Sequence, residues 1–418
     1  NRPLDYPYMR FVRANMLNLN SWPCKELNEK VPRTRVIHGV AMVCLGLSYL
    51  IGGYIYLRIN WNILSFFDKG HIYISLLMTA VVFVRIVSLT DAPKCKEIIR
   101  LFLNKFHIFY FKDGSEYAMK THKQIHAIAN VYTIWIVGQS ALGILGFNLI
   151  PLYRNYLQGK FKSTRLYNTT YEQAVYLELP FDIVNSLLYF LLQNIRHSLI
   201  ISVCSSTWFV VWDLMLSLIV FHVWGHYKIL LNNLESFPLP AKKEIVHVNN
   251  GTANAEMYSE EELKTISKML GDCVDYHRMI ADYTGQISDA FGFTLFVTYA
   301  FHQTSGCLLL LECSQMTPEA LMLYGPLTAV LFQQLIQMSV IFELIGSTTE
   351  RLKDGVYGLP WEYMDVNNRK TVAIFLINVQ EPIHVKAMGI ANVGVTSMAA
   401  ILKTSFSYFA FLRSMPSD

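Results

Sequence analysis

Apolar residues gather into seven long runs along this chain, and polar or charged segments separate the runs. A helix needs about 20 mostly apolar residues to cross a bilayer, and each run is close to that length or longer. We therefore predict an all-α membrane protein with seven transmembrane helices. The predicted spans are residues 36–57, 71–89, 127–153, 198–224, 285–311, 320–346 and 390–412.

The basic residues outside the spans are divided unevenly between alternate segments. The side that includes the N-terminus holds 25 of the 35 Lys and Arg residues, and the opposite side holds 8. Basic loops tend to stay in the cytoplasm, so we predict a cytoplasmic N-terminus and an extracellular C-terminus. The resulting segments are a cytoplasmic tail (1–35), spans one to four (36–224), a large cytoplasmic loop (225–284), spans five and six (285–346), a cytoplasmic segment (347–389), and the seventh span with a short extracellular tail (390–418).

Composition narrows the class of protein further. The net charge is only +4 and no basic block occurs, which argues against a nucleic-acid partner. The seven cysteines are scattered, so no disulfide framework is expected. The first 35 residues are polar and charged, without the apolar core of a signal peptide. Asn168 begins an Asn-x-Thr sequon in a predicted outer loop and is a glycosylation candidate.

Two cytoplasmic segments contain patterns typical of helices. Ser259 precedes Glu262 by three residues, which is a capping-box pattern for a helix start. Apolar residues then recur at spacings of three and four, so we predict one long helix that continues into the fifth span. In the segment 347–389, Val372 and Phe375 share an apolar face that ends before Pro382. The apolar faces of these helices require a partner, either within this chain or on a neighbouring subunit.

Five predicted spans carry one charged residue each: Arg85, Asp213, Asp289, Glu343 and Lys403. A charge inside a membrane is costly and usually faces protein or water. Arg85, Asp289 and Glu343 lie near the inner ends of their spans, where they can reach the interface or pair with one another. Asp213 and Lys403 lie deeper in the membrane.

Lys403 also begins a stripe along the seventh span. Ser407, Phe411 and Met415 follow at intervals of four residues, so all four side chains share one helix face. A face that changes from charged to hydroxyl to apolar suits a helix beside a water-filled path. Alternatively, Lys403 pairs with an acidic group on a neighbouring helix. Both interpretations stay open at this stage.

The outer halves of spans two, three, four and six are rich in aromatic, hydroxyl and amide side chains. An apolar cavity with a few such polar groups suits a long aliphatic ligand with one polar head, although ordinary helix packing uses the same residues. The candidate ligand-binding residues are Tyr73, Leu77, Met78, Gln139, Ser140, Gly143, Phe147, Ser205, Trp208, Trp212, Tyr324, Thr328 and Phe332.

Two pairs of histidines have the spacing H-x-x-x-H: His122 with His126, and His222 with His226. On a helix each pair shares one face, which is a spacing that metal sites use. Membrane di-iron enzymes need more ligands than this, including adjacent His-His pairs, and none occurs here. We therefore predict no metal and no cofactor, and we assign the rings to the inner membrane edge.

The last sixty residues carry the most specific motifs of the chain. They are residues 360–365 (PWEYMD), 368–371 (NRKT), 378–382 (NVQEP) and 401–409 (ILKTSFSYF). These motifs resemble the carboxyl-terminal signature of insect odorant receptors, and in detail the branch of moth sex-pheromone receptors. The rest of the resemblance lies in the seven spans, the inverted orientation and the large fourth loop.

The resemblance implies much that spacing alone does not. Members of the family form tetrameric, ligand-gated, non-selective cation channels in the plasma membrane of olfactory sensory neurons, and a tuning subunit joins a shared odorant co-receptor. The segment 347–389 then belongs to an anchor that holds subunits together. Aligned on Tyr408, the gate positions fall on Phe411 and Met415. The odorant cavity is expected among spans two, three, four and six.

We therefore expect a channel subunit gated by a long-chain aliphatic acetate, aldehyde or alcohol, and not an enzyme. A homomeric channel that needs no co-receptor is one alternative. A seven-span receptor that signals through other proteins is another, but it predicts an extracellular N-terminus, and this sequence has no D-R-Y or N-P-x-x-Y element. A membrane lipid enzyme that uses the histidine pairs is the third.

Overall fold

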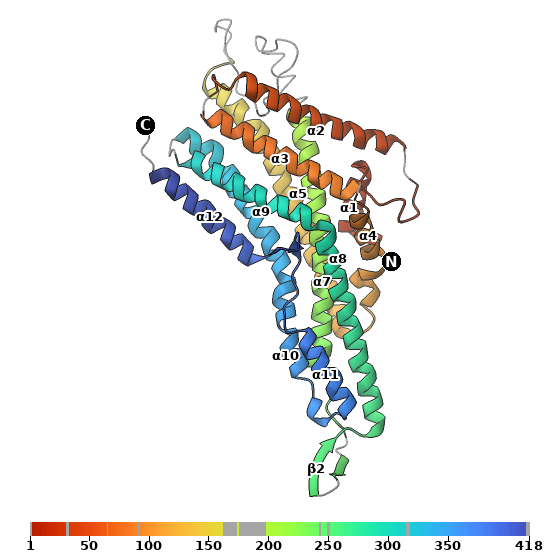
Figure 1. The fold of residues 1–418 in the computed structure, drawn as a ribbon. Helices are drawn as coiled ribbons and strands as arrows, with labels where there is room; N and C mark the ends of the chain where they lie inside the picture. Colours follow the sequence, from red (N-terminus) through yellow and green to blue (C-terminus); the bar gives the residue numbers. More distant parts are fainter. Residues whose placement is uncertain are drawn as a thin grey trace.

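The computed structural model describes residues 2–30, 33–64, 66–90, 92–161, 174, 198–241, 244–248, 251–314 and 318–414. Long helices dominate this part of the chain, and each predicted span lies largely within one of them (Figure 1). The long helices are α2 (Arg33–Ile59), α3 (Phe66–Thr90), α5 (Glu116–Leu157), α7 (Leu199–Glu235), α8 (Glu260–Cys313), α9 (Pro318–Glu350) and α12 (Val395–Ser414).

Shorter elements connect the long helices and cap the cytoplasmic end predicted above. They are a 3-10 turn η1 (Pro3–Asp5), α1 (Pro7–Asn18), α4 (Pro93–Leu101), the π-helical η2 (Phe102–Phe106), η3 (Ile108–Phe111), α10 (Leu352–Tyr357), η5 (Trp361–Tyr363) and α11 (Val366–Asn378). Two antiparallel hairpins complete the described part: β1 (Glu244–Val248) with β2 (Gly251–Met257), and β3 (Lys386–Ala387) with β4 (Ala391–Asn392).

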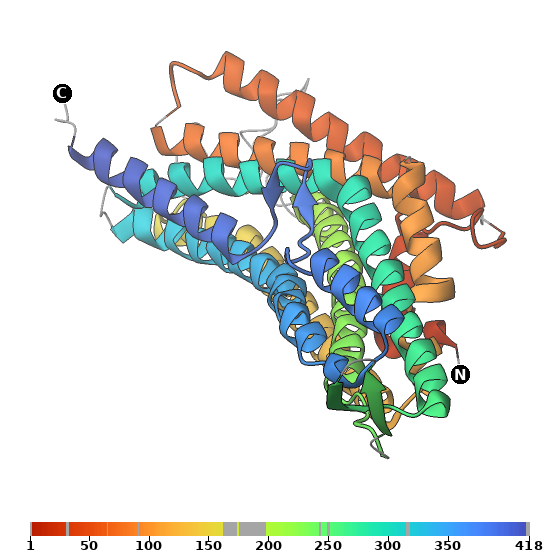
Figure 2. The same cartoon turned by 60° about the horizontal axis from the view of Figure 1, so that its bottom comes forward.

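α7 is the central helix of the molecule. Its sequence between Trp208 and Leu234 is apolar on nearly every face, which is typical of a helix that is buried on all sides. It packs against α3, α5, α8 and α9, and it runs through the middle of the bundle in both ribbon views (Figure 1, Figure 2). The largest hydrophobic core of the described residues is built around this helix.

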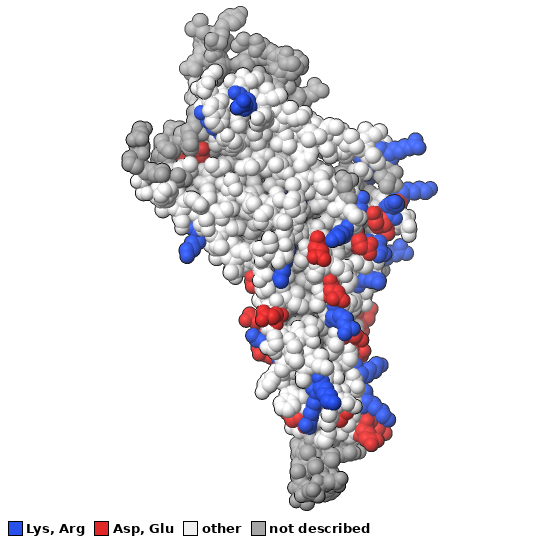
Figure 3. Space-filling model, in the orientation of Figure 1, with Lys and Arg blue, Asp and Glu red and all other residues white. Residues whose placement is uncertain are grey.

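Length and composition make six helices among the described residues suitable for crossing a membrane: α2, α3, α5, α7, α8 and α9. The surface of the wide part of the molecule is almost free of charged side chains on the face shown in Figure 3. Charged groups gather on the narrow stem and along one edge of that face (Figure 3). α12 occupies most of the predicted seventh span, and it carries Lys403 and several hydroxyls.

The stem consists of the ends of α7 and α8 together with α10 and α11 (Figure 1). α8 begins with the predicted capping box: the Ser259 hydroxyl accepts from the Glu262 amide, and the Glu262 carboxylate accepts from the Ser259 amide. It is one continuous helix of 54 residues that bends between the stem and the wide part and so joins the two (Figure 1, Figure 2). α11 packs on α8 and buries Val372 and Phe375, as their spacing predicted.

The N-terminal segment is more ordered than its polar sequence suggested. α1 begins at Pro7 within the predicted tail, and it buries Tyr8, Met9, Val12 and Met16 against the main core. These four residues recur at helical spacing, while Arg10 is exposed. α1 thereby packs against α2, α5 and α7.

The last long helix begins at Val395, so the predicted start at residue 390 is wrong. The β3–β4 hairpin occupies residues 386–392, and its turn contains Met388 and Gly389 with positive φ angles of 52° and 71°. A helix cannot continue through a residue in this left-handed conformation. Asn168 and Met415 lie outside the described residues.

Candidate functional site

A cavity of about 220 Å³ lies between α3, α5, α7, α8 and α9, with Tyr49 of α2 at its edge. Apolar side chains form most of its wall, and serines, glutamines and one ion pair interrupt them. An apolar protein cavity of about 150 Å³ holds benzene, so this cavity has room for a small organic molecule. Sites for larger ligands measure about 300–1,000 Å³, so the walls must move to admit a long chain.

The structure places seven of the thirteen predicted ligand-binding residues on the wall of this cavity. They are Met78, Gln139, Ser140, Gly143, Phe147, Ser205 and Trp212. They come from α3, α5 and α7, three of the helices that the sequence selected. Ligand binding by these residues stays a prediction.

The structure places the other six predicted residues away from the cavity wall. Trp208 and Tyr324 are buried in the hydrophobic cores, Leu77 packs beside the second core, and Tyr73 is 40% exposed near Trp61. The remaining two are Thr328 and Phe332: the Thr328 hydroxyl bonds to the Tyr324 carbonyl, and the Phe332 ring stacks on Phe406 of α12.

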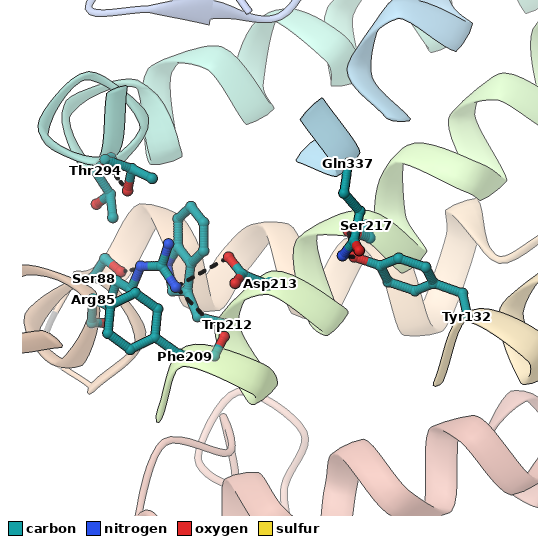
Figure 4. A network of polar contacts seen from close by, with 10 residues as sticks. Arg85, Ser88, Tyr132, Phe209, Trp212, Asp213, Ser217, Thr294 and Gln337 are labelled. Carbon is teal, nitrogen blue, oxygen red and sulfur yellow. Dashed lines mark hydrogen bonds and ion pairs between the residues drawn. The ribbon is translucent and has the colours of Figure 1, made fainter. Parts of the chain in front are cut away.

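An ion pair on the cavity wall was not among the predicted site residues. Arg85 Nη1 lies 3.0 Å from Asp213 Oδ1, so Arg85 pairs with span four and not with Asp289 or Glu343 (Figure 4). The guanidinium also lies over the Phe209 and Trp212 rings, 4.2 and 4.5 Å from their centres. The sequence could have predicted this ion pair, because spans two and four carry opposite charges and two buried charges are stable only when they are paired.

A second polar group on the cavity wall is centred on Tyr132 of α5. Its hydroxyl accepts hydrogen bonds from Ser217 Oγ at 3.1 Å and from Gln337 Nε2 at 3.0 Å (Figure 4). These bonds join α5, α7 and α9 at one point of the cavity. Gln337 in turn accepts from Gln333 and from the Trp135 indole, which extends the polar seam between α5 and α9.

The stripe predicted on the seventh span lies on the exposed side of α12. Lys403, Ser407 and Phe411 are exposed, whereas Ser405 on the other face is fully buried against α8. Among the described residues, no acidic group lies within ion-pair distance of Lys403, so the predicted partner on a neighbouring helix of this chain is not found there. The exposed stripe is therefore available to another subunit or to water.

Residues 71–406 match the family model described as 7tm Odorant receptor, which covers well over half of the chain. The chain belongs to the insect odorant receptor family. This is a receptor family and not an enzyme family, in agreement with the sequence prediction.

Relatives of this odorant receptor include two receptors of Drosophila melanogaster. Odorant receptor 67a is 22% identical over 329 residues, which are 77% of this chain and 74% of that receptor. Odorant receptor 85c is 26% identical over 152 residues, but this alignment spans only 36% of this chain and 39% of the relative. The sequence likeness to individual receptors is therefore modest, and for receptor 85c it covers less than half of either chain.

Solved structures share the fold of this odorant receptor over nearly the whole chain. The insect olfactory receptor OR5 from Machilis hrabei superimposes with a TM-score of 0.75 at 14% identity, covering 97% of both chains. The same receptor in complex with eugenol gives a TM-score of 0.71 over 96% of this chain and 97% of that one. At this identity the likeness establishes the fold alone.

The two H-x-x-x-H pairs of this odorant receptor converge on one cluster near α1. The His126 and His122 rings are in contact through a 2.9 Å nitrogen–nitrogen hydrogen bond, and the His107 and His222 ring centres are 4.1 Å apart. Each ring is engaged by other protein groups; His226, for example, bonds to the Tyr276 hydroxyl and the Phe106 carbonyl. In the described part of the chain, no three His, Cys, Asp or Glu side chains are arranged to hold a metal ion.

Proposed function

We propose that this odorant receptor is the tuning subunit of a ligand-gated, non-selective cation channel, and that it assembles with the shared odorant co-receptor as a tetramer. The main support for this proposal is that the same two helices contact both the cavity and α12. α8 and α9 form part of the cavity wall, and α12 packs on both. A ligand that moves these walls therefore moves the helix proposed to line the pore.

The contacts between α12 and its neighbours support this coupling. The Phe332 ring of α9 stacks on Phe406, and Gln303 Nε2 of α8 donates to Ser405 Oγ at 3.3 Å. Phe332 follows the cavity-lining residue Leu331 directly. A change in the rotation of α9 is thereby transmitted to α12 through a ring contact.

The proposed ligand is a long-chain aliphatic acetate, aldehyde or alcohol, as expected for a moth sex-pheromone receptor. The carboxyl-terminal motifs support this branch, and the largely apolar cavity wall supports an aliphatic chain. Burial of the chain contributes about 0.8 kcal/mol per CH2 group. Because the cavity is small before binding, ligand affinity for an expanded arrangement shifts the population toward it.

The decisive experiment is current recording from cells that express this chain with and without the co-receptor. We expect a panel of long-chain acetates, aldehydes and alcohols to evoke current only from the pair. Current from this chain alone overturns the heteromer and establishes a homomeric channel. No current from the pair, with both proteins at the surface, overturns the proposal.

The proposed orientation has its own test. The excess of basic residues on one set of segments supports a cytoplasmic N-terminus and a plasma membrane location in olfactory neurons. An epitope tag at the N-terminus is expected to be stained only after permeabilisation of the cells. Staining of intact cells reverses the topology and favours a receptor that signals through other proteins.

A further inference from the structure

One end of the cavity carries a carboxylate oxygen that has no assigned donor. Asp213 Oδ1 bonds to Arg85 Nη1, whereas no donor from the described residues is assigned to Oδ2. The Arg85 side chain is 2% exposed, but the Asp213 side chain retains 23% of its surface, and both line the cavity. The accessible part of this neutral ion pair is therefore a hydrogen-bond acceptor.

The Tyr132 hydroxyl of α5 contacts the same face of α7 through Ser217. It accepts two hydrogen bonds, from Ser217 and Gln337, so its own hydrogen remains available for donation. Ser217 follows Asp213 by four residues on α7, which places their side chains on the same face with Cβ atoms about 5–6 Å apart. Figure 4 shows Asp213 between the Arg85 group and the Tyr132 group.

We infer that this end of the cavity binds the head group of the ligand and that the head group is a hydroxyl. A hydroxyl donates to Asp213 Oδ2 and accepts from Tyr132 at the same time. The inference rests on the proposed function and selects one of the three proposed ligand classes, the alcohol. It assigns the head group to two side chains that were not among the candidate ligand-binding residues.

The other head groups fit this end of the cavity less well. The oxygen atoms of an acetate or an aldehyde only accept hydrogen bonds, so Asp213 Oδ2 stays desolvated without a donor. An unpaired buried polar group costs enough to weaken binding by roughly tenfold or more. A protonated amine donates, but it places a second positive charge beside Arg85, where the carboxylate is already neutralised.

The test compares dodecanol, dodecyl acetate and dodecanal on cells that express the receptor with its co-receptor. We expect dodecanol to act at a concentration roughly tenfold lower than the other two. Tyr132→Phe and Asp213→Asn are expected to raise the effective concentration of dodecanol about tenfold and to leave that of dodecyl acetate within a factor of three. Tyr54→Phe, which removes an exposed hydroxyl of α2, is the matched control and is expected to change neither.

Two outcomes of the current recordings overturn the inference while the proposed function stands. One is equal sensitivity of the wild-type receptor to alcohol and acetate, and the other is a Tyr132→Phe variant that responds to both as the wild type does. Tyr132→Phe keeps the ion pair, so it decides the matter if Asp213→Asn does not reach the surface.

Thermal unfolding of the purified heteromer is the second readout, because a ligand that binds the folded state raises its Tm. We expect a larger Tm shift from dodecanol than from dodecyl acetate, even if no current is evoked; equal shifts overturn the inference.

Discussion

The Tyr8 hydroxyl of α1 lies 2.6 Å from His126 Nδ1 of α5, although 118 residues separate them. The neighbouring bonds determine which atom carries each proton. His107 Nδ1 accepts from the Phe109 amide, so its Nε2 carries the hydrogen and donates to Tyr8 at 3.2 Å. Tyr8 then donates to His126 Nδ1, and His126 Nε2 donates to His122. An added proton on any of these rings removes an acceptor, so the chain is complete only when the imidazoles are neutral.

Replacement of Tyr8 by Phe is expected to destabilise the receptor by about 1–3 kcal/mol, since it leaves polar atoms of His107 and His126 buried without a partner. Tyr8 is only 1% exposed, so water does not replace the lost hydroxyl. The free energy of unfolding in detergent measures the effect. Tyr153→Phe is the control on α5, because Tyr153 is 55% exposed and its loss is expected to change stability by less than about 0.5 kcal/mol. Equal stability of the two variants contradicts the buried hydrogen bonds of Tyr8.

The pH dependence of stability follows from His107. Burial, reinforced by the neighbouring histidines, lowers the pKa of His107 to about 2, whereas an unfolded histidine has a pKa near 6.5. Between these values the unfolded chain binds a proton that the folded chain does not, so stability decreases as the pH falls below about 6.5. The contribution of this residue reaches up to about 1.4 kcal/mol per pH unit.

Unfolding at pH 7.5, 6.5 and 5.5 tests this expectation in the wild type and in His107→Asn. The amide of Asn accepts and donates but does not titrate, so the variant is expected to lose stability less steeply with acid. Identical slopes in the two proteins mean that His107 takes up protons in the folded state.

Local signals in the sequence were sufficient for the long helices. The apolar runs located seven of them, and the Ser259 capping box located the first turn of α8. Local patterns could not predict the histidine cluster, because His107, His122 and His222 come from three segments whose packing depends on the whole bundle. α1 was missed because its charged residues lower the average hydropathy, although Val12 and Met16 mark a buried face.

The sequence predicted the helices around the cavity better than it predicted the individual residues that line it. Composition selected helices that do surround it, but each helix presents only one face to the cavity, and its rotation is set by its neighbours. Met78 of α3 lines the cavity, whereas its neighbour Leu77 faces away and packs beside the second core. Tyr132 and Gln337 were not selected, since a lone polar residue in a span does not reveal what it faces.

Gly143 of α5 offers a direct test of the ligand cavity. It lines the cavity, and no atom lies within 4 Å of the position that a Cβ would occupy. Gly143→Ala is expected to stabilise α5 by up to about 1 kcal/mol and to reduce the cavity by one methyl group. Overpacking by a methylene typically costs about 1–3 kcal/mol, so the effective concentration of a long-chain ligand is expected to rise about fivefold or more.

Gly146→Ala is the matched control for this change. Gly146 also has open space at its Cβ position and lies on the same helix, but it is not on the cavity wall. It is expected to give the stabilisation without the change in ligand response. If both alanine variants respond to ligand as the wild type does, this part of the cavity does not hold the ligand.

The first turn of α12 is held by a carboxylate from another helix. Glu343 Oε2 of α9 accepts a 2.9 Å hydrogen bond from the Val395 amide, one of the amides that a helix start leaves without an internal partner. The residues that precede α12 are fastened in the same way: the Lys386 amide donates to Ser288 Oγ of α8, and the Ile383 amide donates to Thr349 Oγ1 of α9. The position of α12 thus depends on three side chains of the helices that line the cavity.

Substitution of Glu343 is expected to have a graded effect. Glu343→Ala removes the cap and is expected to cost about 0.5–2 kcal/mol, the range measured for helix N-caps. Glu343→Gln keeps an acceptor oxygen and loses the charge that the helix dipole favours, so a cost of about 0.3–1 kcal/mol is expected. Urea unfolding in detergent gives the stabilities, and the ligand concentration for half-maximal current gives the coupling. We expect stability and ligand sensitivity both to decrease in the order wild type, Glu343→Gln, Glu343→Ala, because a loosely held α12 responds less to movement of α9. If Glu343→Gln is as impaired as Glu343→Ala, the charge of Glu343, and not its hydrogen bond, holds the helix.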